Sequence, residues 1–178
     1  MARFKMFILL LTLLLVLSSC NNVKSEGFDA FCGAFACEYS YVDDDKLYRV
    51  RLLAGEMDDE GGRSATLSFI EPETLEGLEC RLSEGECRVS CGDVAITGES
   101  AKAFLLSAEP LLFGGRAQFC EVSELGGVKC ERFVMMIDGI EASIYVDGRT
   151  ELPIAVTSMQ MGKEAKLNII SFERNGKQ

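Results

Sequence analysis

The chain has 178 residues, with 28 acidic against 18 basic side chains and a net charge of −10. That length suits one domain with a sizeable core rather than two. Because the sequence contains no His, Ser-His-Asp triads, Cys-His dyads and histidine-based zinc sites are excluded. The acidic balance argues against nucleic acid as a partner, since phosphate binding needs clustered Lys and Arg. Eight Cys indicate an oxidising, extracytoplasmic environment.

The N-terminal segment predicts export. Arg3 and Lys5 precede an apolar run over 6–17, which is shorter than the ~20 residues that a membrane-spanning helix needs. A charged start, a short apolar run and small residues are typical of a signal peptide, here 1–19. The run ends in Leu-Ser-Ser-Cys at 17–20, which resembles the lipobox of bacterial lipoproteins. That resemblance implies cleavage before Cys20 and acylation of Cys20; an ordinary secretory signal is the alternative.

After the signal peptide we expect a polar tether at 20–27 and a single β domain at 28–178. Loss of 1–19 leaves 16 basic against 28 acidic residues, a net charge of −12. Such a surface repels anionic head groups, so we expect acyl chains on Cys20 to hold the protein at the membrane. Acidic tracts at 43–45 and 58–60 lack the spacing of a calcium loop and are interpreted as solvated turns.

Most of the mature chain shows a period of two. Apolar and polar residues alternate over 47–54, 63–71, 78–82, 87–91 and 140–146. Gly- and Asp-rich turn signals separate these runs at intervals near ten residues, as in antiparallel meanders. Strands with one apolar face belong to a sheet that is covered on one side only.

One segment, 100–112, has helical spacing instead. Its apolar residues recur at i, i+3 and i+4, namely at Ala101, Phe104, Leu105, Ala108, Leu111 and Leu112. Ser100 is a candidate N-cap and Gly114 a candidate stop, while Pro110 is expected to kink or end the helix early. This helix falls between about six strands and about five, so we expect it to cover the apolar face of the sheet.

Three short motifs carry a family resemblance. Residues 65–78 resemble a strand-then-turn run of small envelope lipoproteins, 145–154 a later turn, and 165–173 the last strand. These features are similar to the LolA/LolB-like lipoprotein-localisation fold. The resemblance implies a mainly β (α+β) fold: a strongly bent antiparallel sheet, or half-barrel, of about ten to eleven strands, with one or few helices covering an apolar cavity.

The sequence departs from that family at its start. Members usually begin with an N-terminal helix, whereas 28–41 is interpreted here as a short lead-in and a strand. In that strand Phe31, Phe35, Tyr39 and Tyr41 share one face. Without the helix, the cover over the sheet is smaller.

Seven Cys remain if Cys20 is acylated. Cys120 and Cys130 are a candidate disulfide, because they oppose each other if 123–127 form a five-residue loop; a two-residue Gly-Gly turn would misalign them. Cys80, Cys87 and Cys91 share a face if Glu84 and Gly85 form a turn, and they offer one bridge plus a spare thiol. Zinc binding by these thiolates lacks support from any His or Cys-x-x-Cys motif, and we expect no metal site and no cofactor.

The function that these features favour is binding. The leading hypothesis is a non-enzymatic, lipid-anchored envelope protein that holds a lipid, an acylated partner or another apolar ligand on the concave sheet face. Candidate lining residues are Phe35, Leu52, Leu67, Phe69, Phe104, Leu105 and Leu112, all of which also suit an ordinary core. The alternative is an interaction module with a packed interior, which docks an envelope protein through its acidic surface or an open strand edge. No catalytic residues are predicted.

Overall fold

The computed structural model describes residues 27–59, 62–160 and 162–174. The predicted signal peptide, Cys20 and most of the predicted tether lie outside them. The described residues form eleven strands: β1 (Phe35–Asp43), β2 (Lys46–Ala54), β3 (Ala65–Glu71), β4 (Leu78–Ser83), β5 (Glu86–Cys91), β6 (Val94–Thr97), β7 (Gln118–Leu125), β8 (Val128–Ile137), β9 (Ile140–Asp147), β10 (Pro153–Gln160) and β11 (Lys163–Arg174). A single 3₁₀ turn, η1 (Glu73–Leu75), follows β3.

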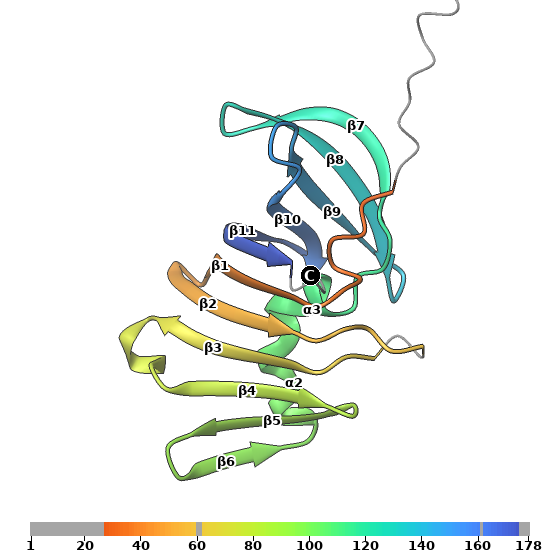
Figure 1. Ribbon diagram of the computed structural model, residues 1–178. Helices are drawn as coiled ribbons and strands as arrows, with labels where there is room; N and C mark the ends of the chain where they lie inside the picture. The colour runs from red at the N-terminus through yellow and green to blue at the C-terminus, as the bar shows by residue number, and fades with distance from the viewer. Residues whose placement is uncertain (1–26, 60–61, 161, 175–178) are drawn as a thin grey trace, which may run out of the picture.

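All eleven strands belong to one open antiparallel sheet. The spatial order is β6-β5-β4-β3-β2-β1-β11-β10-β9-β8-β7. The first meander (β1–β6) and the second meander (β7–β11) therefore meet where β1 pairs with β11. At that seam β1 has a register shift between Glu38 and Tyr39, and such bulges bend a strand and increase its twist. The strands of the two meanders run in different directions in Figure 1. The predicted strongly bent antiparallel half-barrel is confirmed.

The period-two interpretation of the strands is also confirmed. In β2, Val50, Leu52 and Ala54 are buried while Arg51 and Leu53 are exposed. In β3 the buried positions are Ala65, Leu67 and Phe69. Alternate side chains of a strand point to opposite faces, so these residues place the core on one side of the sheet.

The predicted helix forms as a broken helical segment. Its parts are α2 (Glu99–Lys102), the 3₁₀ helix η2 (Ala103–Ala108) and α3 (Glu109–Leu112). Pro110 lies in the first turn of α3, where a residue without an N–H is tolerated, so the segment does not end early at Pro110: it changes from 3₁₀ to α geometry just before this residue and continues to Leu112. The expectation that Ser100 caps the helix is wrong: Gly98 is the N-cap, and Ser100 lies within the first turn.

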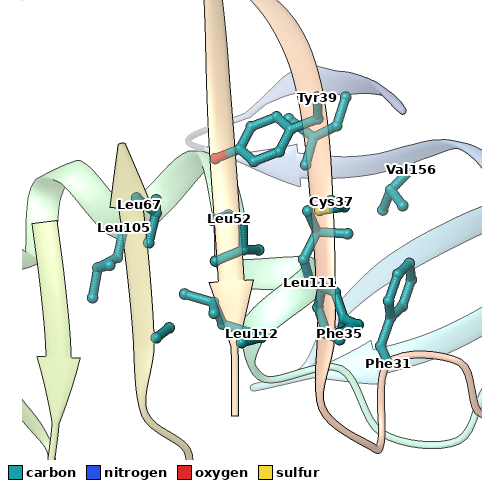
Figure 2. Close-up of a cluster of buried hydrophobic side chains, with 14 of the residues drawn as sticks. Phe31, Phe35, Cys37, Tyr39, Leu52, Leu67, Leu105, Leu111, Leu112 and Val156 are labelled. Atoms are coloured by element: carbon teal, nitrogen blue, oxygen red, sulfur yellow. The ribbon is translucent and has the colours of Figure 1, made fainter. Parts of the chain in front are cut away.

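This helical segment covers the hollow of the sheet, as Figure 1 shows for α2 and α3. Its first turn contacts β5 and β6. In η2, Ser107 hydrogen-bonds to Tyr39 of β1 at 3.3 Å, and the Phe104 ring meets Phe69 of β3 edge-on, with centroids 6.3 Å apart. Leu111 and Leu112 of α3 are fully buried against the sheet (Figure 2).

Residues 27–34, the described part of the chain before β1, form a lead-in without a helix, as the sequence predicts for the residues from Phe28. Phe28 pairs with Ala117 in an isolated bridge, which ties the lead-in to the start of β7. Phe31 packs against Phe35 and Phe172, with ring centroids 5.4 and 5.6 Å away. Aromatic packing therefore joins the lead-in to both β1 and β11.

Candidate functional site

A surface pocket opens between the helical segment and one end of the first meander. Its volume is about 390 Å³, toward the lower end of the ~300–1,000 Å³ typical of small-molecule sites. The walls come from the residues just before β3, the β4–β5 hairpin and all three parts of the helical segment. The lining residues are Gly62, Arg63, Leu82, Gly85, Lys102, Leu105, Leu106, Glu109 and Phe113.

The apolar part of the pocket joins core and surface. Leu82 and Leu105 belong to the hydrophobic core and form its inner wall. Leu106 and Phe113 are 40% and 39% exposed and form its outer wall. The helical spacing that buries Leu105 leaves its neighbour Leu106 at the surface. An apolar ligand would therefore cover side chains that are otherwise in water.

Arg63 supplies a buried positive charge to this pocket. The residue is only 5% exposed. Its Nη2 donates to the carbonyl oxygens of Phe31 at 2.5 Å and Cys32 at 3.3 Å, and its guanidinium carbon lies 5.4 Å from the centre of the Phe35 ring. Burial lowers the pKa of this guanidinium, which nevertheless stays charged, as arginine does in proteins.

Two nitrogen atoms of that guanidinium lack a partner. Nε and Nη1 are buried and make no hydrogen bond. An unsatisfied buried donor costs roughly 1–3 kcal/mol, and more when it is charged. Arg63 thus places a positive charge in the wall of a pocket whose other walls are largely apolar. That combination suits a ligand with an apolar chain and an anionic group.

Two further ionisable residues line the pocket. Lys102 is exposed and adds a second cationic side chain. Glu109 is half-buried, and burial, with a smaller contribution from the nearby Asp138 carboxylate, raises its pKa. A carboxyl with a raised pKa is the more easily protonated, so its charge opposes an anionic ligand less at mildly acidic pH.

The structure places the seven predicted lining residues mainly in the core. Of these seven, all of which the structure describes, Leu105 lines the pocket and the other six do not. Phe35, Leu52, Leu67 and Leu112 are 0% exposed, and Figure 2 shows them packed together beside Leu111. Phe69 is also buried, and Phe104 is half-buried against it. The sequence pattern thus predicted which residues lie on the concave face of the sheet, but it did not predict the pocket between the helical segment and the β4–β5 hairpin.

The structure does not bring Cys120 and Cys130 together. Gly126 and Gly127 form a two-residue turn between β7 and β8, so Cys130 lies opposite Ser123. Cys120 falls at the register shift between Phe119 and Glu121, and it is exposed whereas Cys130 is buried. The described residues contain no five-residue loop at this hairpin. The geometry matches the alternative in which the two thiols are misaligned.

The described residues offer no metal site: no three His, Cys, Asp or Glu side chains gather in a way that could hold an ion. Over the same residues, no helix is long and apolar enough to cross a membrane.

The class of protein is defined by the sheet and its cover: an open antiparallel half-barrel with a helical segment in its hollow.

No family model matches the sequence, and no curated protein matches it. Solved structures match the fold. An uncharacterized conserved protein from Thermus thermophilus shares 13% identity with a TM-score of 0.51, over 84% of this chain and 83% of its own.

A second solved structure, MucB, shares 10% identity with a TM-score of 0.50, over 83% of this chain; the chain spans 57% of the MucB chain. A LolA superfamily protein from Nitrosomonas europaea is also matched, at 9% identity with a TM-score of 0.38, over 87% of this chain and 89% of its own. These likenesses concern the fold alone, and the matches to the Thermus thermophilus protein and to MucB support the half-barrel fold that the sequence predicts.

Proposed function

We propose that this protein is a lipid-anchored, extracytoplasmic protein of a bacterial envelope, which binds an anionic amphiphile and catalyses no reaction. The observation that carries the binding function is the pocket of about 390 Å³ under the helical segment. Its apolar walls take the chain of the ligand, and the buried guanidinium of Arg63 takes the anionic group. Free fatty acids and acylated envelope molecules with a nearby anionic group share this chemistry.

Charge supports this choice of ligand. The chain carries a net charge of −10, and yet two of the three ionisable residues that line the pocket are cationic. In a protein with such an excess of acidic side chains, Arg63 and Lys102 create a local site for an anion. The position of Arg63 deep in the wall favours an anionic group that enters with the chain rather than one that stays in water.

The binding experiment uses dodecanoate as the probe and fluorescence displacement as the measurement. We expect dodecanoate to displace a bound fluorescent fatty acid. Leu106→Trp fills the pocket from its exposed wall, and it should weaken binding by roughly tenfold or more, which corresponds to about 1.4 kcal/mol.

The matched control is Leu53→Trp. Leu53 is 50% exposed on β2 and does not line the pocket, so its replacement should leave the displacement curve unchanged. No displacement by dodecanoate, or equal loss in the two variants, would rule out the pocket as the binding site.

The membrane anchor rests on Cys20, which lies outside the described residues. Cys20→Ala removes the thiol that the lipobox resemblance assigns to acylation, so we expect the protein to move from the membrane fraction to the soluble fraction. Fractionation followed by a salt wash measures this, and Ser19→Ala, which keeps a small residue before Cys20, should stay with the membrane. If Cys20→Ala still sediments with membranes after the wash, the anchor assignment is wrong.

A second candidate function is docking of a protein partner at the sheet edge, which one observation favours. β6 is the outer strand of the first meander, all four of its residues are exposed, and Val94 and Ile96 are 71% and 45% exposed. An apolar open edge can pair with a strand of another chain. In that role the protein would bind its partner equally well after Leu106→Trp, whereas ligand binding in the pocket would be lost.

A further inference from the structure

Two buried thiols lie in contact across the β4–β5 hairpin. Cys80 of β4 lies opposite Val89, and Cys87 of β5 lies opposite Leu82, so the two cysteines are diagonal neighbours on one face. Their Sγ atoms are 3.3 Å apart. Glu84 and Gly85 form the connecting two-residue turn, both with positive φ (51° and 76°). This turn type fixes the strand register that brings the two thiols together.

We propose that Cys80 and Cys87 form an intramolecular disulfide when the chain folds in an oxidising environment. A disulfide bond is about 2.05 Å long, so the two sulfur atoms need to approach by little more than 1 Å. Both residues are 0% exposed and lie on the core face of their strands. The bond would join β4, which supplies Leu82 to the inner wall of the pocket, to the neighbouring strand β5.

The third cysteine of this hairpin is the spare thiol. Cys91 lies at the end of β5, opposite Leu78, and is exposed, whereas the Cys80 thiol touches that of Cys87. The sequence places all three cysteines on one face without distinguishing among them. The contact between the sulfur atoms selects the pair.

The oxidant is a disulfide of a second molecule, either a thiol oxidoreductase or a small-molecule disulfide. One cysteine thiolate attacks it to give a mixed disulfide and releases one thiol. The other cysteine then attacks the mixed disulfide, which forms the Cys80–Cys87 bond and releases a second thiol. Two electrons pass to the oxidant, and the two protons lost by the cysteines end on the released thiols.

The bond must form before the core closes. In the folded protein, burial and the neighbouring Cys87 raise the pKa of the Cys80 thiol to about 12, and no oxidant can reach either sulfur. Only a thiolate attacks a disulfide. The hairpin spans few residues and forms from local contacts, so its thiols can meet while they are still accessible.

The test is refolding of the full chain from a reduced, unfolded state in a mixture of oxidised and reduced glutathione. Free thiols are then blocked with N-ethylmaleimide and the protein is digested with trypsin. Cleavage after Arg63, Arg81, Arg88 and Lys102 puts Cys80, Cys87 and Cys91 on the separate peptides 64–81, 82–88 and 89–102. We expect a linked pair of 64–81 and 82–88 that separates on reduction, with Cys91 blocked.

Two variants serve as controls. Cys91→Ser should leave the linked pair unchanged, and Cys80→Ala should leave Cys87 blocked. N-ethylmaleimide on both Cys80 and Cys87 of the refolded chain, or a link from either of them to peptide 89–102, would overturn the proposal. Because the refolding needs neither export nor a ligand, its result is independent of the proposed function.

Discussion

Leu52→Ala should lower the free energy of unfolding by about 3–4 kcal/mol, as expected for Leu→Ala at a fully buried site. Leu52 is 0% exposed, and its backbone lies between those of Cys37 in β1 and Leu67 in β3. The helical segment closes the space above this part of the sheet (Figure 2). Packed neighbours on both sides limit how far the cavity can collapse. Denaturant unfolding followed by circular dichroism measures the loss.

The next residue along the strand is the control. Leu53 is 50% exposed on the opposite face of β2, and Leu53→Ala should change the free energy of unfolding by about 0.5 kcal/mol or less. The two variants share the same chemistry, strand and position in the sheet, so their difference measures burial alone. Equal losses would mean that both faces of β2 are covered and that the face assignment is wrong.

The strands could be predicted because their pattern is local. A strand that is covered on one side alternates in hydrophobicity, whichever strands lie beside it. Leu52 and Leu67 therefore fall on the core face by position alone. Pairing of β1 with β11 is not visible in this way, because it joins the two ends of the described chain. Only the structure shows this pairing.

The helical segment was predictable in position but not in form. The spacing of Ala101, Leu105 and Ala108 fixes a helical face, and all three are buried. The 3₁₀ geometry of η2 depends on how the segment lies across the bent sheet, which no local pattern records. Pro110 adds one signal, since it cannot donate the hydrogen bond that would continue a helix from η2.

The pocket residue Arg63 left a signal in the sequence that the strand pattern alone did not single out. Arg63 shares the parity of Ala65, Leu67 and Phe69, so a charged side chain stands in phase with the apolar face of β3. A charged side chain on the core face of a strand is expected to have a buried partner or to belong to a binding site. Leu106 and Phe113 carried no comparable signal, because an exposed apolar residue is common on any protein surface.

Turn length decided the arrangement of the cysteines. Glu84 and Gly85 form the two-residue turn that the sequence suggested, and it puts Cys80 and Cys87 on one face. Gly126 and Gly127 form a turn of the same length, and it separates Cys120 from Cys130. A glycine pair fits both a two-residue and a longer loop, so the sequence alone could not choose between them.

Arg63→Met should weaken binding of dodecanoate by roughly ten- to a hundredfold, because a hydrogen bond to a charged group contributes about 1.5–3 kcal/mol. Dodecanol, which has the same chain without the charge, should bind the variant and the wild type equally well. Fluorescence displacement with both probes measures the difference. Arg81→Met is the matched control: the Arg81 side chain is 67% exposed on β4 and does not line the pocket, so neither probe should respond.

Stability separates this effect from misfolding. Methionine removes the two unpartnered donors Nε and Nη1, but it also leaves the carbonyl oxygens of Phe31 and Cys32 without the donor that Nη2 provides. These two changes oppose each other, so the free energy of unfolding should shift by no more than about 2 kcal/mol. Equal losses for dodecanoate and dodecanol would show that Arg63 shapes the pocket instead of recognising charge. A loss confined to dodecanoate, in a variant that unfolds like the wild type, would show that the charge of the buried guanidinium attracts the anionic group.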